Sequence, residues 1–359
     1  MQELLAKLVS FKTTEDNPEE VKKGFAYIAS FFDAEKYDIQ RFEKNEKYSL
    51  LISFKGKDAL RPQILLNGHF DVVPAESEDQ YQVRIEGNKA YGRGTLDMKG
   101  MASVLIEVML ELGKQENPPD VALLLNADEE VGGSNGARYM VQEVGIKPEF
   151  VVCPDAPYEG EFKIVLKEKG IAWVDLEAKG KVAHGAYPWL GENALEKLIK
   201  AVGKIKEWVG PMDPGAWKTT VNFSVLEAPN KTPNKVPGEA KGLLDIRFTE
   251  QMAKTPEELL EKIKGLVPEI SVTLREKGNL IFVEEQHPKV QAFKQIAQEV
   301  LGQRVNFTFE HGATDMRYFG VPGVLFGAKG HGMHAEGEWV SLQSLEGNKK
   351  ILLRFLQEG

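Results

Sequence analysis

Seven histidine and carboxylate residues stand where they could bind metal ions or transfer protons. Each lies at the end of an apolar segment or in the loop after one: His69, Asp71, Asp97, Glu129, Glu130, Asp155 and His334. Strands of an open α/β sheet carry their binding and catalytic groups at their carboxyl ends. We therefore expect these side chains to meet at one edge of a sheet. Imidazole and carboxylate ligands suit zinc, and also manganese or cobalt.

The spacing of two pairs indicates a division of roles. His69 and Asp71 are two residues apart at a strand end, so their side chains share one face. One of them can bind a metal while the other holds its ring or a neighbouring ligand. Glu129 and Glu130 are adjacent and must point in different directions. One can bind a metal while the other faces the substrate, and the residues alone do not decide which.

Each candidate also has an ordinary explanation when it is taken singly. His69 can be a polar residue that ends a strand, and Glu129 with Glu130 can be a surface acid pair. Asp155 between Pro154 and Pro157 can form a turn. A chance arrangement of the whole set after buried strands is a poor explanation, so the set predicts a metal site.

The elements that would position these residues alternate between strand and helix. Apolar segments at 61–71, 119–130, 149–155 and 321–328 predict strands that are buried on both faces. Helical periodicity covers 1–15, 18–32, 99–115, 132–145, 290–302 and 341–357. This order predicts an α/β catalytic domain over 1–166 and 284–359, with a mostly parallel sheet flanked by helices.

The pattern changes near Lys167. Residues 169–180 alternate apolar and polar side chains, as a strand with one solvated face does. A helix, two strands, a further helix that starts at the capping box Thr255–Glu258, and a last strand follow. The order β-α-β-β-α-β predicts a ferredoxin-like α+β domain inserted over 167–283.

The composition excludes several classes of protein. The net charge is −9 and no lysine or arginine cluster stands out, which disfavours a nucleic-acid partner. We expect neither a signal peptide nor a membrane span, because the first residues are charged throughout and no apolar run approaches about 18 residues. Cys153 is the only cysteine, so no internal disulfide is possible. This fits a reducing compartment, and we expect a cytoplasmic location.

Four motifs in this order resemble the co-catalytic zinc aminoacylase/carboxypeptidase family. They are GHFDVVP (68–74), YGRGTLDMKG (91–100), NADEEVGG (126–133) and HAEGEWV (334–340). The family includes glutamate carboxypeptidase, succinyl-diaminopimelate desuccinylase, acetylornithine deacetylase, aminoacylase and several di- and tripeptidases. The resemblance spans essentially the whole chain, including the insert, and it implies two zinc ions per subunit, with cobalt or manganese as substitutes.

The resemblance also implies a role for each matching residue. Asp97 would bridge the two metals, with His69 and Asp155 on one and Glu130 and His334 on the other. Glu129 would be the general base, and Asp71 would orient His69 or tune it. His334 is preferred to His331 because Glu338 follows it in the family's H-x-x-x-E ending.

Three residues of the insert match family positions that contact the substrate. His184 and Asn234 would lie near the scissile carbonyl, and Arg247 would bind a substrate carboxylate. Their ordinary explanations are stronger, since Asn234 can shape a turn and Arg247 can pair with a surface acid. By resemblance, the insert is a lid and also pairs two subunits in a homodimer. The segment with Thr314, Asp315 and Arg317 matches a less defined family segment, and its role stays open.

Two positions depart from the family pattern. Met101 stands where a second glycine is frequent, and we expect that to affect helix packing rather than chemistry. Asp155 replaces the glutamate of glutamate carboxypeptidase and the desuccinylase. The peptidase branches use aspartate there, which slightly favours peptide substrates.

The sequence therefore predicts a dinuclear metallohydrolase of a short peptide or an N-acyl amino acid. A deacylase of the desuccinylase or deacetylase type is the alternative within this class. A catalytically silent relative that only binds metal is an alternative of another class, but it should have lost Glu129 or a ligand, and every position is filled. Phosphoester hydrolysis at two metals is chemically possible, but the sequence has no phosphate-binding glycine loop.

Overall fold

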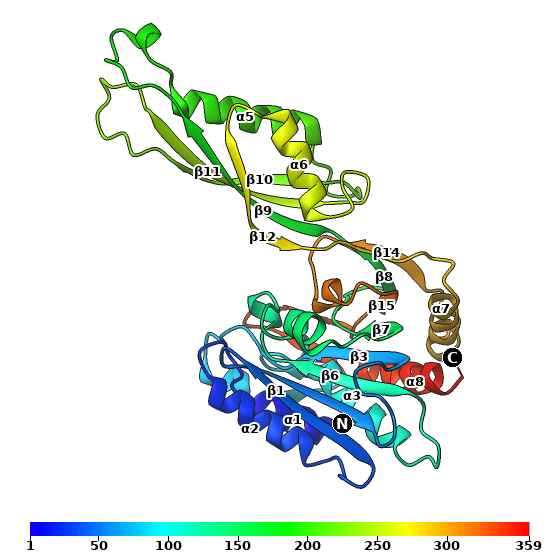
Figure 1. Ribbon diagram of the computed structural model, residues 1–359. Coiled ribbons are helices and arrows are strands. Elements are labelled where there is room, and N and C mark those ends of the chain that lie inside the picture. The colour runs from blue at the N-terminus through cyan, green and yellow to red at the C-terminus, as the bar shows by residue number, and fades with distance from the viewer. Residues whose placement is uncertain (359) are drawn as a thin grey trace. The chain divides into compact units, whose positions relative to one another are not determined.

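The computed structural model describes residues 1–358 and divides the chain into two compact units (Figure 1). Unit 1 comprises Met1–Leu166, Val283–Thr308 and the chain from Thr314 onward. Unit 2 comprises Lys167–Phe282 together with Phe309–Ala313, and this last segment lies outside the range expected for the insert.

A mixed sheet is the framework of unit 1, although its last strand, Ile281–Phe282, belongs to unit 2. Its strands, in spatial order, are β1 (Tyr37–Lys44), β2 (Lys47–Phe54), β6 (Val121–Asn126), β3 (Ile64–His69), β7 (Phe150–Cys153), β15 (Gly323–Leu325), β8 (Lys163–Glu168) and β13 (Ile281–Phe282), and β14 (Asn306–Glu310) also pairs with β8. The four strands from β6 to β15 are parallel, and the described pairings outside them are antiparallel. The expected sheet is therefore parallel only at its centre. At one edge the two-residue turn Asn45–Glu46, with φ of 49° and 59°, can join only antiparallel strands.

Helices cover this sheet and bury its central strands. They are α1 (Gln2–Ser10), α2 (Pro18–Ala29), α3 (Lys99–Leu112), α4 (Ala137–Tyr139), α7 (Pro288–Leu301) and α8 (Leu342–Glu358). Helix α3 contacts β3 and β6 directly and also packs against α1 and α8. Every residue of β3, β6 and β7 is buried, in agreement with their apolar sequences. The burial fixes these strands, and with them the residues that follow their carboxyl ends.

Some expected helices differ from the observed ones. The helices expected at 1–15 and 18–32 end at Ser10 and Ala29, and Asn17 precedes α2 without accepting a side-chain hydrogen bond. The helix expected at 132–145 is reduced to α4 and a π turn over Met140–Val144. The physical reason is a competing partner, because Asp128 Oδ2 accepts the backbone N–H groups of Asn135 and Gly136 and holds that stretch as a loop.

A second, small sheet was not expected from the sequence. It joins β4 (Arg84–Glu86), β5 (Lys89–Tyr91), β17 (Trp339–Ser341) and β16 (Gly330–His331), all antiparallel. Strands of two or three residues are too short to show a periodicity. Their pairing brings the segment before Asp97 and the segment around His334 together.

Unit 2 has the expected β-α-β-β-α-β order. The elements are β9 (Gly170–Lys179), α5 (Ala194–Val209), β10 (Thr220–Glu227), β11 (Glu239–Phe248), α6 (Pro256–Leu266) and β12 (Ser271–Gly278). The strand order β10-β11-β9-β12 is antiparallel throughout, which is a ferredoxin-like sheet. Apolar residues of the two helices and one face of the sheet form a single core. Thr255 caps α6 by accepting the N–H of Glu258, while the Glu258 side chain accepts from Lys254.

Among the described residues, none of the helices combines the length and the apolar character needed to cross a bilayer.

Candidate metal centre

His69 ends β3 and points its two ring nitrogens at different partners. Its Nε2 atom lies 2.9 Å from Asp97 Oδ1 and 3.7 Å from Asp155 Oδ1. Its Nδ1 atom lies 3.1 Å from the carbonyl oxygen of Asp71 and 3.4 Å from Asp71 Oδ1. Nε2 is therefore the nitrogen that can face a metal, and Asp71 holds the opposite side of the ring. The side chain of His69 is 1% exposed, so this half of the site is enclosed.

His334 approaches Asp97 from the other side. Its Nε2 atom lies 3.0 Å from Asp97 Oδ2 and 3.1 Å from Glu130 Oε2. Each oxygen of Asp97 thus has its own histidine within 3.0 Å. The His334 side chain is 47% exposed, so the site opens to solvent on this side.

Two groups of ligand atoms overlap at His69. The His69, Asp97 and Glu130 ligand atoms lie within 4.8 Å of one another, and so do those of His69, Glu129 and Asp155. Glu129 and Glu130 follow β6 in a short 3-10 turn, so they project to different neighbours as their adjacency predicts. The structure brings all seven candidates of unit 1 into one site.

The loop that carries the two glutamates is fixed from both ends. Asp71 Oδ2 accepts the backbone N–H of Glu130 at 3.0 Å. Arg317 Nη2 and the Tyr318 hydroxyl both donate to the carbonyl of Gly132, at 3.0 and 2.6 Å. The segment left open in the sequence analysis therefore supports this loop.

Asp315 belongs to the same support. Its Oδ2 atom accepts a hydrogen bond from Asn126 Nδ2 at 2.9 Å, at the end of β6. Its other oxygen, Oδ1, is buried without a hydrogen-bond partner.

The backbone around Asp97 is held by a buried ion pair between Arg93 and Glu338, and the sequence did not predict this pairing. Glu338 Oε1 accepts the N–H groups of Leu96 and Asp97, at 2.8 and 3.2 Å. Glu338 Oε2 accepts the Gly94 N–H at 3.0 Å and lies 2.6 Å from Arg93 Nη1. Two signals were present in the sequence: Glu338 ends the H-x-x-x-E motif that starts at His334, and Arg93 stands four positions before Asp97.

The carboxylates shift the histidines of this site toward their charged form. Burial by itself would lower the pKa of His69, but Asp155, Asp71 and Asp97 raise that pKa well above 6.5. Hydrogen bonds to Asp97 and Glu130 raise the pKa of His334 to about 10. Burial opposes the charge of Asp97, yet His334 and His69 keep the pKa of Asp97 below its usual value.

The site contains more carboxylates than its two histidines can neutralise. Burial, with the charges of Asp97 and Glu130, raises the pKa of Asp155 to about 7 against the effect of His69. Burial and the charge of Asp155 raise the pKa of Glu129 well above 4.5. Glu130 Oε1 and Asp71 Oδ1 are buried without hydrogen-bond partners. Crowded, buried and incompletely paired carboxylates beside two imidazoles fit divalent cations well.

His184 and Asn234 lie together in unit 2. His184 forms an isolated β-bridge with Lys235, and the Gly185 N–H donates to the Asn234 carbonyl at 2.6 Å. Both side chains are exposed. His184 Nδ1 accepts the Ala186 N–H at 3.1 Å, which leaves Nε2 as its outward nitrogen.

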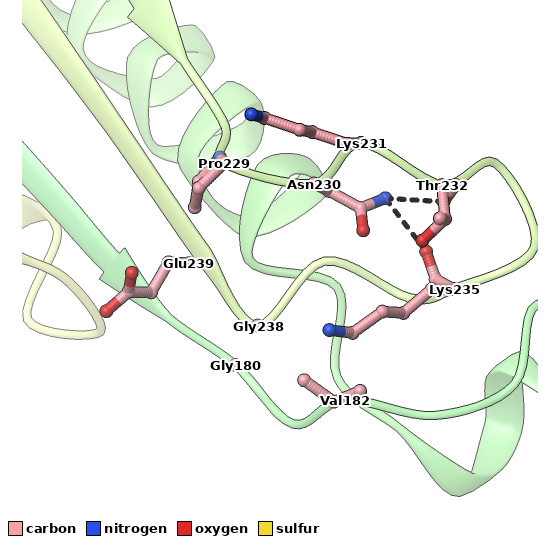
Figure 2. Close-up of a pocket in the computed structure, with 9 residues that line it drawn as sticks. All are labelled: Gly180, Val182, Pro229, Asn230, Lys231, Thr232, Lys235, Gly238 and Glu239. Atoms are coloured by element: carbon pink, nitrogen blue, oxygen red, sulfur yellow. Dashed lines mark hydrogen bonds between the residues drawn. The ribbon is translucent and has the colours of Figure 1, made fainter.

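The loop that carries Asn234 borders a pocket of about 540 Å³ (Figure 2). Asn230 Nδ2 donates to the carbonyls of Thr232 and Lys235, both at 3.0 Å, and so fixes this loop. Lys231 and Lys235 line the pocket, whereas His184 and Asn234 do not. The turn around Asn234 thus has a structural explanation in Asn230.

Arg247 lies on β11, and its guanidinium is already paired. Its Nε and Nη2 atoms lie 2.9 and 3.3 Å from the two carboxylate oxygens of Asp245, two residues earlier on the same strand. The ordinary explanation considered for this residue, pairing with a nearby acid, is therefore what the structure contains.

Comparison with known proteins decides the family. A model of the peptidase family M20/M25/M40 matches residues 65–358. The chain belongs to this family. The resemblance noted in the motifs is thereby confirmed, and this M20 chain is a hydrolase of amide or peptide bonds.

Curated relatives of this M20 chain carry two kinds of name. Succinyl-diaminopimelate desuccinylase of Rickettsia bellii is 25% identical over 347 residues, covering 90% of this chain and 88% of that protein. The enzyme of the same name from Gluconobacter oxydans is 27% identical, covering 82% and 81%. A probable carboxypeptidase of Paracoccidioides brasiliensis is 30% identical over 233 residues, covering 60% and 51%.

Solved structures confirm the fold. The M20 metallo-carboxypeptidase Sso-CP2 of Sulfolobus solfataricus superposes with a TM-score of 0.75 at 17% identity, over 99% of this chain and 98% of that one. A tripeptidase of Staphylococcus aureus gives the same TM-score at 19% identity, over 99% and 97%. Both the α/β unit and the ferredoxin-like unit are therefore part of the fold that this chain shares with these structures.

Proposed function

We propose that this chain hydrolyses an amide bond in a short peptide or an N-acyl amino acid, using two divalent metal ions and Glu129 as the general base. One observation carries the proposal: each carboxylate oxygen of Asp97 has a different histidine within 3.0 Å. A carboxylate shared in this way suits two cations a few ångströms apart.

The ligands divide into two sets around Asp97. His69 and Asp155 would hold one ion, and Glu130 and His334 the other. Zinc suits these nitrogen and oxygen donors best, and cobalt or manganese can replace it. When bound, two such ions polarise the substrate carbonyl and make water available as a nucleophile near neutral pH.

Glu129 would carry the proton from the attacking water to the leaving group. It lies within the His69–Asp155 group of ligand atoms, while its neighbour Glu130 lies beside His334. Its carboxylate takes a proton from the attacking water and then delivers that proton to the leaving nitrogen. The support from Arg317 and Tyr318 fixes the following turn, so Glu129 can act repeatedly from one position.

The insert would complete the site. The outward Nε2 of His184 can donate to the oxyanion that develops on the carbonyl, with Asn234 beside it; removal of such a donor typically costs about 3 to 4 kcal/mol. Arg247 can bind a substrate carboxylate through both oxygens only if it exchanges Asp245 for the substrate.

Different observations favour an N-acyl amino acid and a short peptide as the substrate. The curated relatives that cover most of this chain are desuccinylases, which act on an N-acyl amino acid by their name. Asp155 in place of glutamate favours the peptidases, as does the carboxypeptidase relative. An N-acyl amino acid deacylase is therefore retained as the second candidate.

We propose in addition that two copies pair through unit 2. Strand β10 is an edge strand of the ferredoxin-like sheet, and its Val225 and Leu226 side chains are 39% and 45% exposed. A second copy would cover this apolar edge. Light scattering on the purified chain should give twice the monomer mass, and a monomer would contradict this part of the proposal.

Turnover and metal content measured together test the function. The chain, stripped and then loaded with zinc or cobalt, should bind two ions and hydrolyse at least one class among dipeptides, N-acetyl amino acids, N-succinyl amino acids and γ-glutamyl conjugates. Chelation should abolish the activity and readdition should restore it. Two bound ions without turnover on any class would identify a silent relative, and fewer than two ions would refute the dinuclear site.

A further inference from the structure

The ion pair between Arg93 and Glu338 connects the two chain segments that deliver Asp97 and His334. The side chains are 2% and 1% exposed, and their closest atoms are 2.6 Å apart. They belong to segments 245 residues apart in the sequence, which the small sheet of β4, β5, β17 and β16 brings side by side. Neither residue offers an atom to the metal-binding groups described above.

Glu338 acts on the loop before Asp97. Its two carboxylate oxygens together accept three backbone N–H groups, those of Gly94, Leu96 and Asp97. Gly94 has a φ of 79°, so the loop bends sharply at this point. A carboxylate that collects several N–H groups fixes a loop of this kind, because its hydrogen bonds are charge-assisted. The backbone position of Asp97 is thereby set by Glu338.

Arg93 acts on the segment of His334. Its Nη1 atom binds Glu338, and its Nη2 atom donates to the backbone carbonyl of His334 at 3.2 Å. His334 has a φ of 63°, a conformation that non-glycine residues rarely adopt without support from their surroundings. The guanidinium therefore holds the backbone of one ligand while its partner Glu338 holds the backbone of the other.

We propose that Arg93 and Glu338 are positioning residues that set the spacing of Asp97 and His334, and so determine the affinity of the metal ion that His334 and Glu130 bind. This inference rests on the proposed function. The ion near His334 takes two of its three ligands, Asp97 and His334, from backbone held by the pair. The ion near His69 takes only Asp97 from it. Loss of the pair should therefore weaken the two ions unequally.

Metal affinity in the variant Glu338→Gln tests this. Glutamine has a single acceptor oxygen, and its NH₂ group would face N–H donors. Titration of the stripped protein with zinc or cobalt against a chromophoric chelator measures both affinities. The ion that we assign to His334 and Glu130 should bind about 10- to 100-fold less tightly than in wild type. The affinity of the other ion, which we assign to His69 and Asp155, should stay within about threefold of wild type. This is a smaller effect than loss of an outer partner usually causes. Excess metal should restore activity, which an unfolded fraction would not do.

Glu107→Gln is the matched control. Glu107 lies on α3, the helix that starts after Asp97, and pairs with Lys349 and the N-terminal ammonium, each at 2.6 Å. Its loss removes partly buried ionic contacts from the same helix but touches neither ligand segment. We expect Glu107→Gln to lower the thermal midpoint while both ions bind as in wild type.

Arg93→Lys provides the second variant and serves should Glu338→Gln fail to fold. Lysine keeps the charge but cannot reach Glu338 and the His334 carbonyl together. The affinity of the ion near His334 should therefore fall to an intermediate degree. Unchanged binding of both ions in these variants, or equal weakening of both, would overturn the inference while the proposed function stands. A wild-type chain with fewer than two ions would overturn the proposed function and the inference together.

Discussion

Asp97 and His334 lie 237 residues apart in the chain, yet their Oδ2 and Nε2 atoms are 3.0 Å from each other. The other oxygen of Asp97 lies 2.9 Å from His69 Nε2. A single carboxylate therefore connects a buried histidine at the end of β3 with a half-exposed histidine in a C-terminal loop. The two halves of the candidate metal centre therefore meet at this one residue.

Asp97→Asn should reduce the binding of both ions. An amide offers one neutral oxygen where the carboxylate offers two charged ones, so it can neither bridge nor neutralise two cations. We expect both affinities to fall by about 100-fold or more, since loss of an outer partner alone costs 10- to 100-fold. Equilibrium dialysis with metal analysis measures this directly. Two ions bound at wild-type affinity would show that Asp97 is not a bridge.

Local strand patterns predict the strand-end half of this candidate centre, whereas the roles of Asp97 and His334 were predicted from the family motifs. His69, Glu129, Glu130 and Asp155 follow continuously buried strands, and parallel strands deliver their carboxyl ends to one edge. Those local patterns contain enough information to predict that they meet.

The contact of Asp97 with His334 depends on information that no local pattern contains. It is made by the small sheet of β4, β5, β17 and β16, whose strands have two or three residues. The pairing of Arg93 with Glu338 was not predicted for a related reason. Charged residues in glycine-rich stretches resemble surface residues, and only their pairing across the fold buries them. His334 was selected through its family motif, because its positive φ gives no signal in the sequence.

Glu129→Gln should separate proton transfer from metal binding. The amide cannot accept a proton from water, so kcat should fall by about 10²- to 10⁴-fold, the usual contribution of a general base. Metal content should stay at the wild-type level. Glu130→Gln is the natural comparison, since it removes the partner of His334 and should lose an ion. A Glu129→Gln protein that loses metal instead would make Glu129 a ligand and refute its role as base.

His184→Ala tests whether the insert contributes to chemistry. His184 is exposed, and among the described residues its side chain hydrogen-bonds only the Ala186 N–H, so its loss should hardly change the thermal midpoint. Loss of an oxyanion donor should lower kcat by about 10²- to 10³-fold.

His331→Ala is the control for that substitution. His331 is also exposed, pairs with Glu159 at 2.7 Å and belongs to neither ligand group. It should retain wild-type kcat and metal content. Equal rates in the two variants would remove His184 from the site.

Asp315 should make the unfolding free energy depend on pH. Burial, reinforced by the charge of Asp128 and partly offset by Arg317, raises the pKa of Asp315 from 3.8 to about 7. Between these values the folded chain binds a proton that the unfolded chain has released. The stability contributed by the neutral carboxyl is therefore complete below pH 4 and is lost as the pH rises through 7.

Asp315→Asn removes this ionisation and keeps an acceptor oxygen for the Asn126 amide. Each unit of pKa corresponds to about 1.4 kcal/mol, so the variant should be more stable than wild type by roughly 1 to 4 kcal/mol at pH 8. The advantage should disappear toward pH 4. Thermal unfolding of the metal-stripped proteins should show a midpoint raised by several degrees at pH 8 only. The exposed Asp58→Asn should show no such dependence, and a difference for Asp315→Asn that is constant with pH would refute the buried neutral carboxyl.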